Sequence, residues 1–256
     1  MNFVKLPLFA AALLISVTVH AEQIKIAAAA DLRFAMDEIV ATFAKVNPAD
    51  QVEVSYGSSG MFLAQIQQGA PFDLFFSADI AFPRELAAKG FAGSAVKPYA
   101  MGRIVLWSVD RDATKMTLAS LADPKIVRIA IANPLHAPYG RRAEEALRAA
   151  DLWEKLQPKL VFAENISQAA QYVQSGNAQV GIIALALAAS PQLASQGGYW
   201  LVPDKLHAPL EQGFVITKRA EKSALAKRFA EFVSGKEARL VMSRFGFAAP
   251  AEATAK

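Results

Sequence analysis

Short apolar runs alternate with amphipathic helical stretches along nearly the whole chain. Residues 23–28 read as a first strand. A helix is predicted over residues 31–46, because apolar side chains recur there at intervals of three and four. Asn47 and Pro48 end that helix. An alternation of strand and helix is typical of parallel sheets covered by helices, so the chain is predicted to have an α/β fold.

The same pattern continues and then restarts after an extended stretch at residues 99–109. The restart predicts two α/β lobes, and we expect the chain to cross from one lobe to the other at least twice. We expect residues 22–100 and 212–256 in the first lobe and residues 101–211 in the second. Further strands are predicted at 52–56, 73–77, 128–132, 160–163, 179–185 and 213–217, and further helices at 61–68, 80–89, 141–150, 166–175, 223–234 and 236–244.

The first 21 residues have the three parts of a secretory signal peptide. Lys5 supplies the positive start, residues 6–19 form an apolar run, and Val19-His20-Ala21 is a small-x-small cleavage site. The run is too short for a spanning helix, and nothing downstream approaches 18 uninterrupted apolar residues. We therefore expect cleavage after Ala21 and a mature protein in the periplasm.

Composition narrows the class further. The absence of cysteine excludes a lipidated N-terminal cysteine, a disulfide framework and a thiolate nucleophile. The formal charge of +4 falls to +3 once Lys5 is removed with the signal. Because the basic residues are dispersed among acidic ones, no nucleic-acid partner is indicated. We interpret the excess positive charge mainly as a solvated basic surface, which would attract an anion only mildly.

Candidate binding chemistry lies at four strand-to-helix junctions, at residues 27–31, 57–60, 133–140 and 164–167. In parallel sheets, ligands bind beyond the carboxyl ends of strands, where helix N-termini present free N–H groups. Two junctions fall in each predicted lobe, so a closing cleft would aim four helix N-termini at one point. Each carries roughly half a positive charge, and four nominally offset a dianion.

Small residues at these junctions suit the same purpose. Alanine and glycine let backbone N–H groups approach an anion, and Ser58 and Ser59 add hydroxyl groups. Taken singly, residues 27–30 are better read as a tightly packed strand end and residues 57–60 as an ordinary turn. Their occurrence together makes the binding interpretation more specific.

At this point the sequence resembles the periplasmic molybdate-binding proteins of ABC transporters, and the likeness covers essentially the whole mature chain. The resemblance implies a two-lobed periplasmic binding protein fold of type II, in which a tetrahedral oxyanion is held between the lobes by hydrogen bonds alone. It also implies a monomer that delivers molybdate or tungstate to an inner-membrane ABC permease, with no resident cofactor. The carrying segments are residues 27–32, 56–60, 69–79, 133–140, 164–166 and 181–186.

The resemblance also implies a set of ligand-binding residues. Ala30 and Asp31 are expected to offer backbone N–H groups, Ser59 a hydroxyl group and Ile166 a backbone N–H group. Tyr139 falls where one branch of the family uses a tyrosine, although a core or hinge role fits it as well. Ala184 stands where other members carry an additional tyrosine. Molybdenum enters this site only as the oxyanion.

Asp31 departs from the family pattern, in which Ser or Asn is common at this position. A carboxylate in contact with a dianion is repulsive. Three explanations remain: the carboxylate caps its own helix, it is protonated and donates, or the ligand is not a simple oxyanion. We favour capping, because it requires no additional proton.

Two other functions stay open. A hydrolase with Ser58 or Ser59 as nucleophile needs a base, and after the signal the chain has only His136 and His207, neither in a recognisable triad. His136 is read as an exposed loop residue. The same fold with other cargo, such as sulfate, a metal chelate or a small carboxylate, is the nearer alternative. Asp31 and Asp79 give a metal little support.

Overall fold

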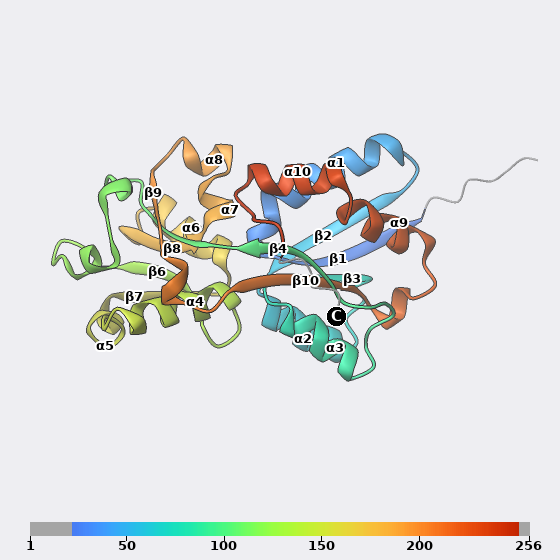
Figure 1. Cartoon of the computed structure of the whole chain (residues 1–256), viewed down its shortest axis with the longest axis horizontal. Coiled ribbons are helices and arrows are strands. Elements are labelled where there is room, and N and C mark those ends of the chain that lie inside the picture. Colours follow the sequence, from blue (N-terminus) through green and yellow to red (C-terminus); the bar gives the residue numbers. More distant parts are fainter. Residues whose placement is uncertain (1–21, 251–256) are drawn as a thin grey trace, which may run out of the picture.

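A computed structural model describes residues 22–250; the predicted signal peptide at residues 1–21 lies outside the described residues. The described chain forms two five-stranded mixed sheets, each with its own helices (Figure 1). We call the part built on the first sheet lobe I and the part built on the second lobe II. This arrangement confirms the two-lobed α/β fold.

Lobe I has the strand order β2-β1-β3-β10-β4. β1 runs parallel to β2 and β3, whereas β10 is antiparallel to β3 and β4. Helices α1, α9 and α10 lie on one face of this sheet, and α2 and α3 on the other (Figure 1). The elements are β1 (Gln23–Ala29), α1 (Arg33–Val46), β2 (Gln51–Gly57), α2 (Ser59–Gln67), β3 (Leu74–Ser77), α3 (Ala81–Ala88), β4 (Lys97–Gly102), β10 (Leu210–Ile216), α9 (Ala224–Val233) and α10 (Lys236–Arg244).

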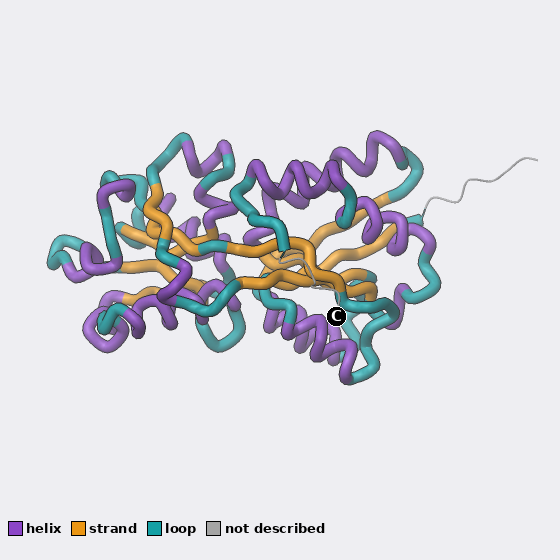
Figure 2. Tube along the Cα trace, viewed as in Figure 1, coloured by secondary structure: helices purple, strands orange, loops and turns teal. Residues whose placement is uncertain are grey.

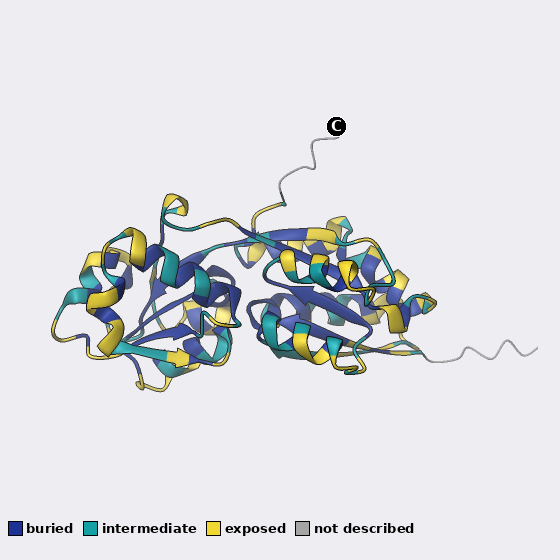
Figure 3. Ribbon diagram, turned by 90° about the horizontal axis from the view of Figure 1, so that it is seen from below, coloured by how far each residue is buried: buried dark blue, intermediate teal, exposed yellow. Residues whose placement is uncertain are grey.

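The two faces of this sheet are buried in separate cores, as Figure 3 shows by the buried strands between half-exposed helices. Along β1, Ile24, Ile26 and Ala28 join the core under α1 and α9, whereas Ala27 joins the core under α2. The alternation follows from the two-residue period of a strand. Because both faces are covered, the strand ends are the places where this lobe can expose polar groups.

Lobe II has the strand order β7-β6-β8-β5-β9, with β6 parallel to β7 and β8. Helices and strands alternate in the chain, as Figure 2 shows by colour. The elements are β5 (Ile104–Trp107), β6 (Ile129–Ala132), α4 (Pro138–Ala149), α5 (Trp153–Leu156), β7 (Leu160–Ala163), α6 (Ile166–Gln174), β8 (Val180–Ala184), α7 (Leu185–Ala188), α8 (Pro191–Ala194) and β9 (Tyr199–Leu201).

The chain crosses between the lobes along two neighbouring paths. The extended stretch predicted at 99–109 is two strands, β4 in lobe I and β5 in lobe II, joined through Arg103. The return path runs from β9 to β10. β4 pairs with β10, and β5 pairs with β9, so the two crossings lie side by side.

Several element boundaries differ from those predicted. α2 begins at Ser59 rather than at residue 61, and α4 begins at Pro138 rather than at residue 141. Proline is well suited to the first position of a helix because its missing N–H has no partner there. The earlier starts move Ser59 and Tyr139 into first helical turns. β9 and the short helices α5, α7 and α8 were not predicted. Within residues 22–250, no helix has the length and apolar character needed to cross a membrane.

Candidate functional site

A small cavity lies where the four predicted strand-to-helix junctions meet, with lobe I on one side and lobe II on the other. Its volume is about 10 Å³, which is about the room of one water-sized sphere. All five predicted site residues line it, and each is at most 4% exposed. The lining residues are Ala29, Ala30, Asp31, Gly57, Ser58, Ser59, Ala78, Ala137, Pro138, Tyr139 and Ile166.

The strand register explains this convergence. Ala29 at the end of β1 is paired with Gly57 at the end of β2, so the chain leaves both strands at one edge of the sheet. In lobe II, Ala132 is paired with Ala163, and α4 and α6 follow from that edge. The Asn165 side chain accepts a hydrogen bond from the Gln168 N–H at the start of α6. Helix N-termini from both lobes therefore border the cavity.

Asp31 is held by a buried hydrogen-bond triad that the sequence did not predict. Its Oδ2 accepts hydrogen bonds from the Tyr139 hydroxyl at 2.8 Å and from the Gln212 amide Nε2 at 2.7 Å. Nε2 also donates to the Tyr139 oxygen at 3.0 Å. Asp31 and Gln212 belong to lobe I and Tyr139 to lobe II, so the triad joins the lobes directly.

The proposed capping role of Asp31 is wrong. Asp31 lies inside a short 3₁₀ helix, Ala30–Leu32, and neither this helix nor α1 has a side-chain cap hydrogen bond. Burial raises the pKa of the Asp31 carboxyl from 3.8 to about 6, and the hydrogen bonds from Gln212 and Tyr139 oppose that rise. The carboxyl group is thus committed to the triad, and its pKa lies closer to neutral pH than that of an exposed aspartate.

The two oxygens of Asp31 differ sharply. Oδ2 has two donors, whereas Oδ1 is buried and has no hydrogen-bond partner within residues 22–250.

Gly102, at the end of β4, makes room for the triad: a Cβ atom there would lie 2.4 Å from the Tyr139 hydroxyl oxygen and 2.6 Å from Gln212 Nε2. Glycine at position 102 is therefore part of the site's construction.

Ser59 and Ser58 have different roles. Ser59 Oγ accepts a hydrogen bond from the Ala78 N–H at 3.0 Å, and no described contact uses its hydroxyl hydrogen. Ser58 Oγ instead donates to the carbonyl oxygen of His136 at 2.6 Å and lies 2.9 Å from His136 Nδ1. Ser59 is thus the serine with a hydrogen available to a ligand, whereas Ser58 is engaged between the lobes.

His136 is not an exposed loop residue but a half-buried contact of lobe II on lobe I. Its carbonyl oxygen also accepts the Gly60 N–H at 2.9 Å, and a Cβ at Gly60 would lie 2.6 Å from that oxygen. Near the other junction pair, Ser167 donates to the Ala30 carbonyl oxygen at 2.8 Å. These contacts hold the two rims of the cleft together.

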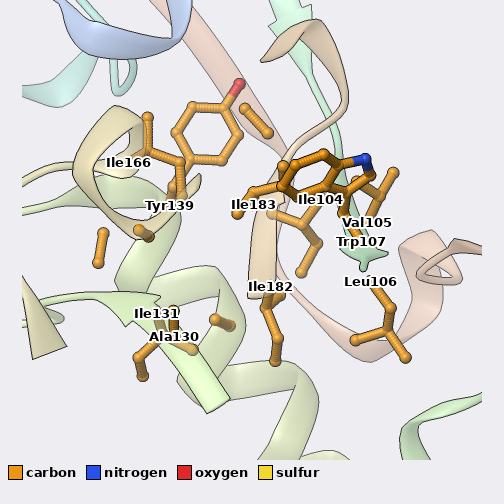
Figure 4. Close-up of a cluster of buried hydrophobic side chains, with 14 of the residues drawn as sticks. Ile104, Val105, Leu106, Trp107, Ala130, Ile131, Tyr139, Ile166, Ile182 and Ile183 are labelled. Carbon is orange, nitrogen blue, oxygen red and sulfur yellow. The ribbon is translucent and has the colours of Figure 1, made fainter. Parts of the chain in front are cut away.

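Tyr139 and Ile166 stand at the edge of the lobe II core. Figure 4 shows the Tyr139 ring beside Ile166, with its hydroxyl oxygen directed away from Ile131 and Ile182. The side chains of Tyr139 and Ile166 are both buried in that core. Burial and the neighbouring Asp31 raise the pKa of the Tyr139 hydroxyl well above its usual value of 10.0, so the hydroxyl keeps its hydrogen.

The cavity lining carries no cationic side chain among the described residues. Within residues 22–250, no cluster of three or more His, Asp or Glu is placed to hold a metal ion. Hydroxyl, carboxyl and backbone N–H groups make up the polar surface. Such a lining suits a ligand that accepts hydrogen bonds from neutral donors.

Two α/β lobes joined by two crossings, with a small polar cavity between them, define the class of solute-binding proteins that enclose a ligand between lobes. The sequence model of the bacterial extracellular solute-binding protein family matches residues 24–248, and the chain belongs to this family.

Several relatives in the family carry a specific name. The molybdate-binding protein ModA of Rhodobacter capsulatus is 37% identical over 199 residues, which cover 77% of each chain. The protein of that name from Azotobacter vinelandii is 34% identical over 236 residues, covering 91% of this chain and 93% of the relative. The solved periplasmic molybdate-binding protein of Azotobacter vinelandii superimposes with a TM-score of 0.84 at 33% identity, over 89% of this chain and all of that one.

More distant structures share the fold alone. The sulfate-binding protein SubI of Mycobacterium tuberculosis superimposes with a TM-score of 0.73 at 16% identity. The superimposed region covers 91% of this chain and 88% of SubI. At this identity the likeness concerns lobe architecture and carries nothing about the ligand.

Proposed function

We propose that this protein captures molybdate, or the near-isosteric tungstate, in the periplasm and delivers it to an ABC permease. The observation that carries the proposal is the meeting of Ala30, Asp31, Ser59, Tyr139 and Ile166 at one small cavity between the lobes. Relatives with 34% and 37% identity are named as molybdate-binding proteins, which selects the ligand within the solute-binding class.

The donors suit a tetrahedral oxyanion. Backbone N–H groups at the first turns of α2, α4 and α6 have no partners inside their own helices. The Ser59 hydroxyl adds a donor directed by its bond from Ala78. The positive ends of the helix dipoles favour a dianion without a lysine or arginine in contact.

The size of the cavity supports a compact ligand. At about 10 Å³, it requires opening of the lobes before an organic molecule of several carbon atoms enters. A compact tetrahedral ion needs less separation of the rims than a bulky chelate, which favours the oxyanion over the chelate.

Closure of the two lobes on the ligand is the change that the permease recognises. The ligand bridges donors from both lobes and so stabilises the closed form over the open form. The permease then distinguishes loaded from empty protein by shape. We propose a monomer for this role, since one chain supplies every lining residue.

Catalysis by Ser58 is disfavoured by geometry. The Ser58 hydroxyl donates to the His136 carbonyl oxygen at 2.6 Å, which leaves the 2.9 Å contact to Nδ1 for an imidazole N–H donating to Oγ. A general base needs the opposite direction of proton transfer. We therefore propose a binding protein without turnover.

Isothermal titration of the mature protein with molybdate, tungstate, sulfate and phosphate tests the proposal. We expect one-to-one binding of molybdate and tungstate, with sulfate and phosphate weaker by at least tenfold. Equal or tighter binding of sulfate would reassign the cargo within the same fold. No heat with any of the four anions, in protein shown to be folded by circular dichroism, would overturn the oxyanion function.

A further inference from the structure

We propose that the Asp31 carboxyl group is protonated when the oxyanion is bound and donates a hydrogen bond to it from Oδ1, so that capture takes up one proton from solvent. The inference rests on the proposed function, because it concerns how the same cavity holds its ligand. It assigns to Asp31 a role that neutral residues at this position would fill without a proton.

The need for a proton follows from donor and acceptor types. A carboxylate and a fully deprotonated oxyanion both only accept hydrogen bonds. Asp31 is 1% exposed and lines the cavity, so a ligand that fills the cavity lies against it. Two acceptors of like charge in contact in a buried site repel strongly. One proton between them converts the repulsion into a hydrogen bond.

The hydrogen-bond triad decides which oxygen carries the proton. Oδ2 already accepts from the Tyr139 hydroxyl and the Gln212 amide, so a hydrogen placed there would displace a donor. Oδ1 is buried without any partner among the described residues. Tyr139 and Gln212 therefore act as positioning residues that leave Oδ1 to the ligand.

The hydrogen bonds from Gln212 and Tyr139 favour the ionised form of Asp31, whereas burial favours the neutral form and has the larger effect. α4 contributes Tyr139 and β4 contributes Tyr99, and the pKa of each hydroxyl lies well above 10.0, so both are neutral. His136 and Asp79, which belong to segments next to the cavity, have partners of their own. His136 is bonded to Ser58, and Asp79 is paired with Arg142 at 3.6 Å.

Burial raises the pKa of Asp31 to about 6, so protonating its carboxylate at neutral pH costs little free energy. A bound dianion raises this pKa further, since nearby negative charge disfavours ionisation. Between the pKa of the free protein and that of the complex, affinity falls about tenfold for each unit of pH. Below pH 6 the free carboxyl is already protonated and the affinity levels off.

Titration calorimetry of molybdate at pH 7.5, in buffers with different ionisation enthalpies, counts the protons taken up. We expect close to one proton per molybdate for the wild type. Asp31→Asn and Asp31→Ser, which are neutral at this position, should take up none. The control Glu237→Gln, which removes an exposed carboxylate on α10, should behave as the wild type.

The pH series gives the second readout. From pH 6.5 to 8.5 the wild-type dissociation constant should rise about tenfold per unit, and that of Asp31→Asn should stay flat. Tight wild-type binding without proton uptake would overturn this inference alone and leave the proposed function standing. Equal uptake in Asp31→Asn and wild type would do the same. Absence of binding by folded wild type would instead remove the proposed function itself.

Discussion

The Tyr139 hydroxyl in lobe II donates a 2.8 Å hydrogen bond to Oδ2 of Asp31 in lobe I, between residues 108 positions apart in the chain. The bond exists only while the lobes are close. Because Gln212 donates to the same oxygen from β10, the three side chains are ordered together. The ligand site and the closed arrangement of the lobes are therefore built from the same atoms.

Replacing Tyr139 by Phe removes a donor to Asp31 and leaves the ring in place. The bond forms only when the lobes are close, so its loss destabilises the closed form. A hydrogen bond between neutral groups contributes about 0.5–1.5 kcal/mol, so molybdate binding should weaken roughly two- to tenfold. Titration calorimetry with molybdate measures this loss of affinity. Tyr199→Phe, at an exposed tyrosine of β9, is the matched control. Equal affinities for the two variants would contradict a role for the Tyr139 hydroxyl.

Ser59→Ala tests the hydroxyl donor. Ser59 carries the side-chain hydroxyl at the cavity whose hydrogen is not bonded to any described residue. Its loss should lower the affinity for molybdate about tenfold or more. Ser195→Ala, at an exposed serine that ends α8, should match the wild type. The assignment fails if Ser59→Ala retains wild-type affinity with its fold intact.

Gly102→Ala should damage the triad without touching any of its members. The added Cβ would lie 2.4 Å from the Tyr139 hydroxyl oxygen, and the tightly packed side chains around it must shift. Overpacking of this kind costs about 1–3 kcal/mol. Urea denaturation should show the lower free energy of unfolding, and titration should show weaker molybdate binding. An unchanged unfolding midpoint would mean that the triad has more room than the structure indicates.

Asp31 also makes stability depend on pH. Its folded-state pKa of about 6 lies above the ordinary 3.8, so the folded form binds the proton more tightly than the unfolded form. The corresponding stability is fully present below pH 3.8 and is lost as pH rises through 6, by about 3 kcal/mol at most.

The difference in unfolding free energy between Asp31→Asn and wild type measures this effect. We expect it to move in favour of the variant between pH 4.5 and pH 7.5, in urea titrations without ligand. The same comparison with Glu237→Gln corrects for changes in overall charge. A difference that stays constant with pH would contradict the raised pKa.

Local patterns along the chain were sufficient to predict much of the site. Each junction joins a β-branched run to an amphipathic stretch, and parallel strands bring such junctions to one edge. That reasoning brought the four junctions together, and the family resemblance selected Ser59, Tyr139 and Ile166 within them. All three line the cavity, although the helices carrying Ser59 and Tyr139 begin earlier than predicted.

Long-range partners could not be predicted in this way. Gln212 bonds to Asp31 across 181 positions, and the predicted strand began one residue too late to include it. A signal was present, since Gln212 is a polar residue between apolar positions of a strand whose interior is buried. The capping interpretation of Asp31 failed because it considered only local hydrogen-bond donors, whereas the side-chain donors to Oδ2, Tyr139 and Gln212, are distant in the sequence.

The paired crossings between the lobes also set how the cleft moves. β4 lies against β10, and β5 lies against β9, with Gly102 opposite Leu210 and Val105 opposite Leu201. Each ladder lies within one lobe, so a movement of the lobes leaves both ladders intact and is taken up by the residues that join them, Arg103 and residues 202–209. The two connections lie next to each other, and we therefore expect the cleft to open by bending there, with each lobe moving as a rigid body.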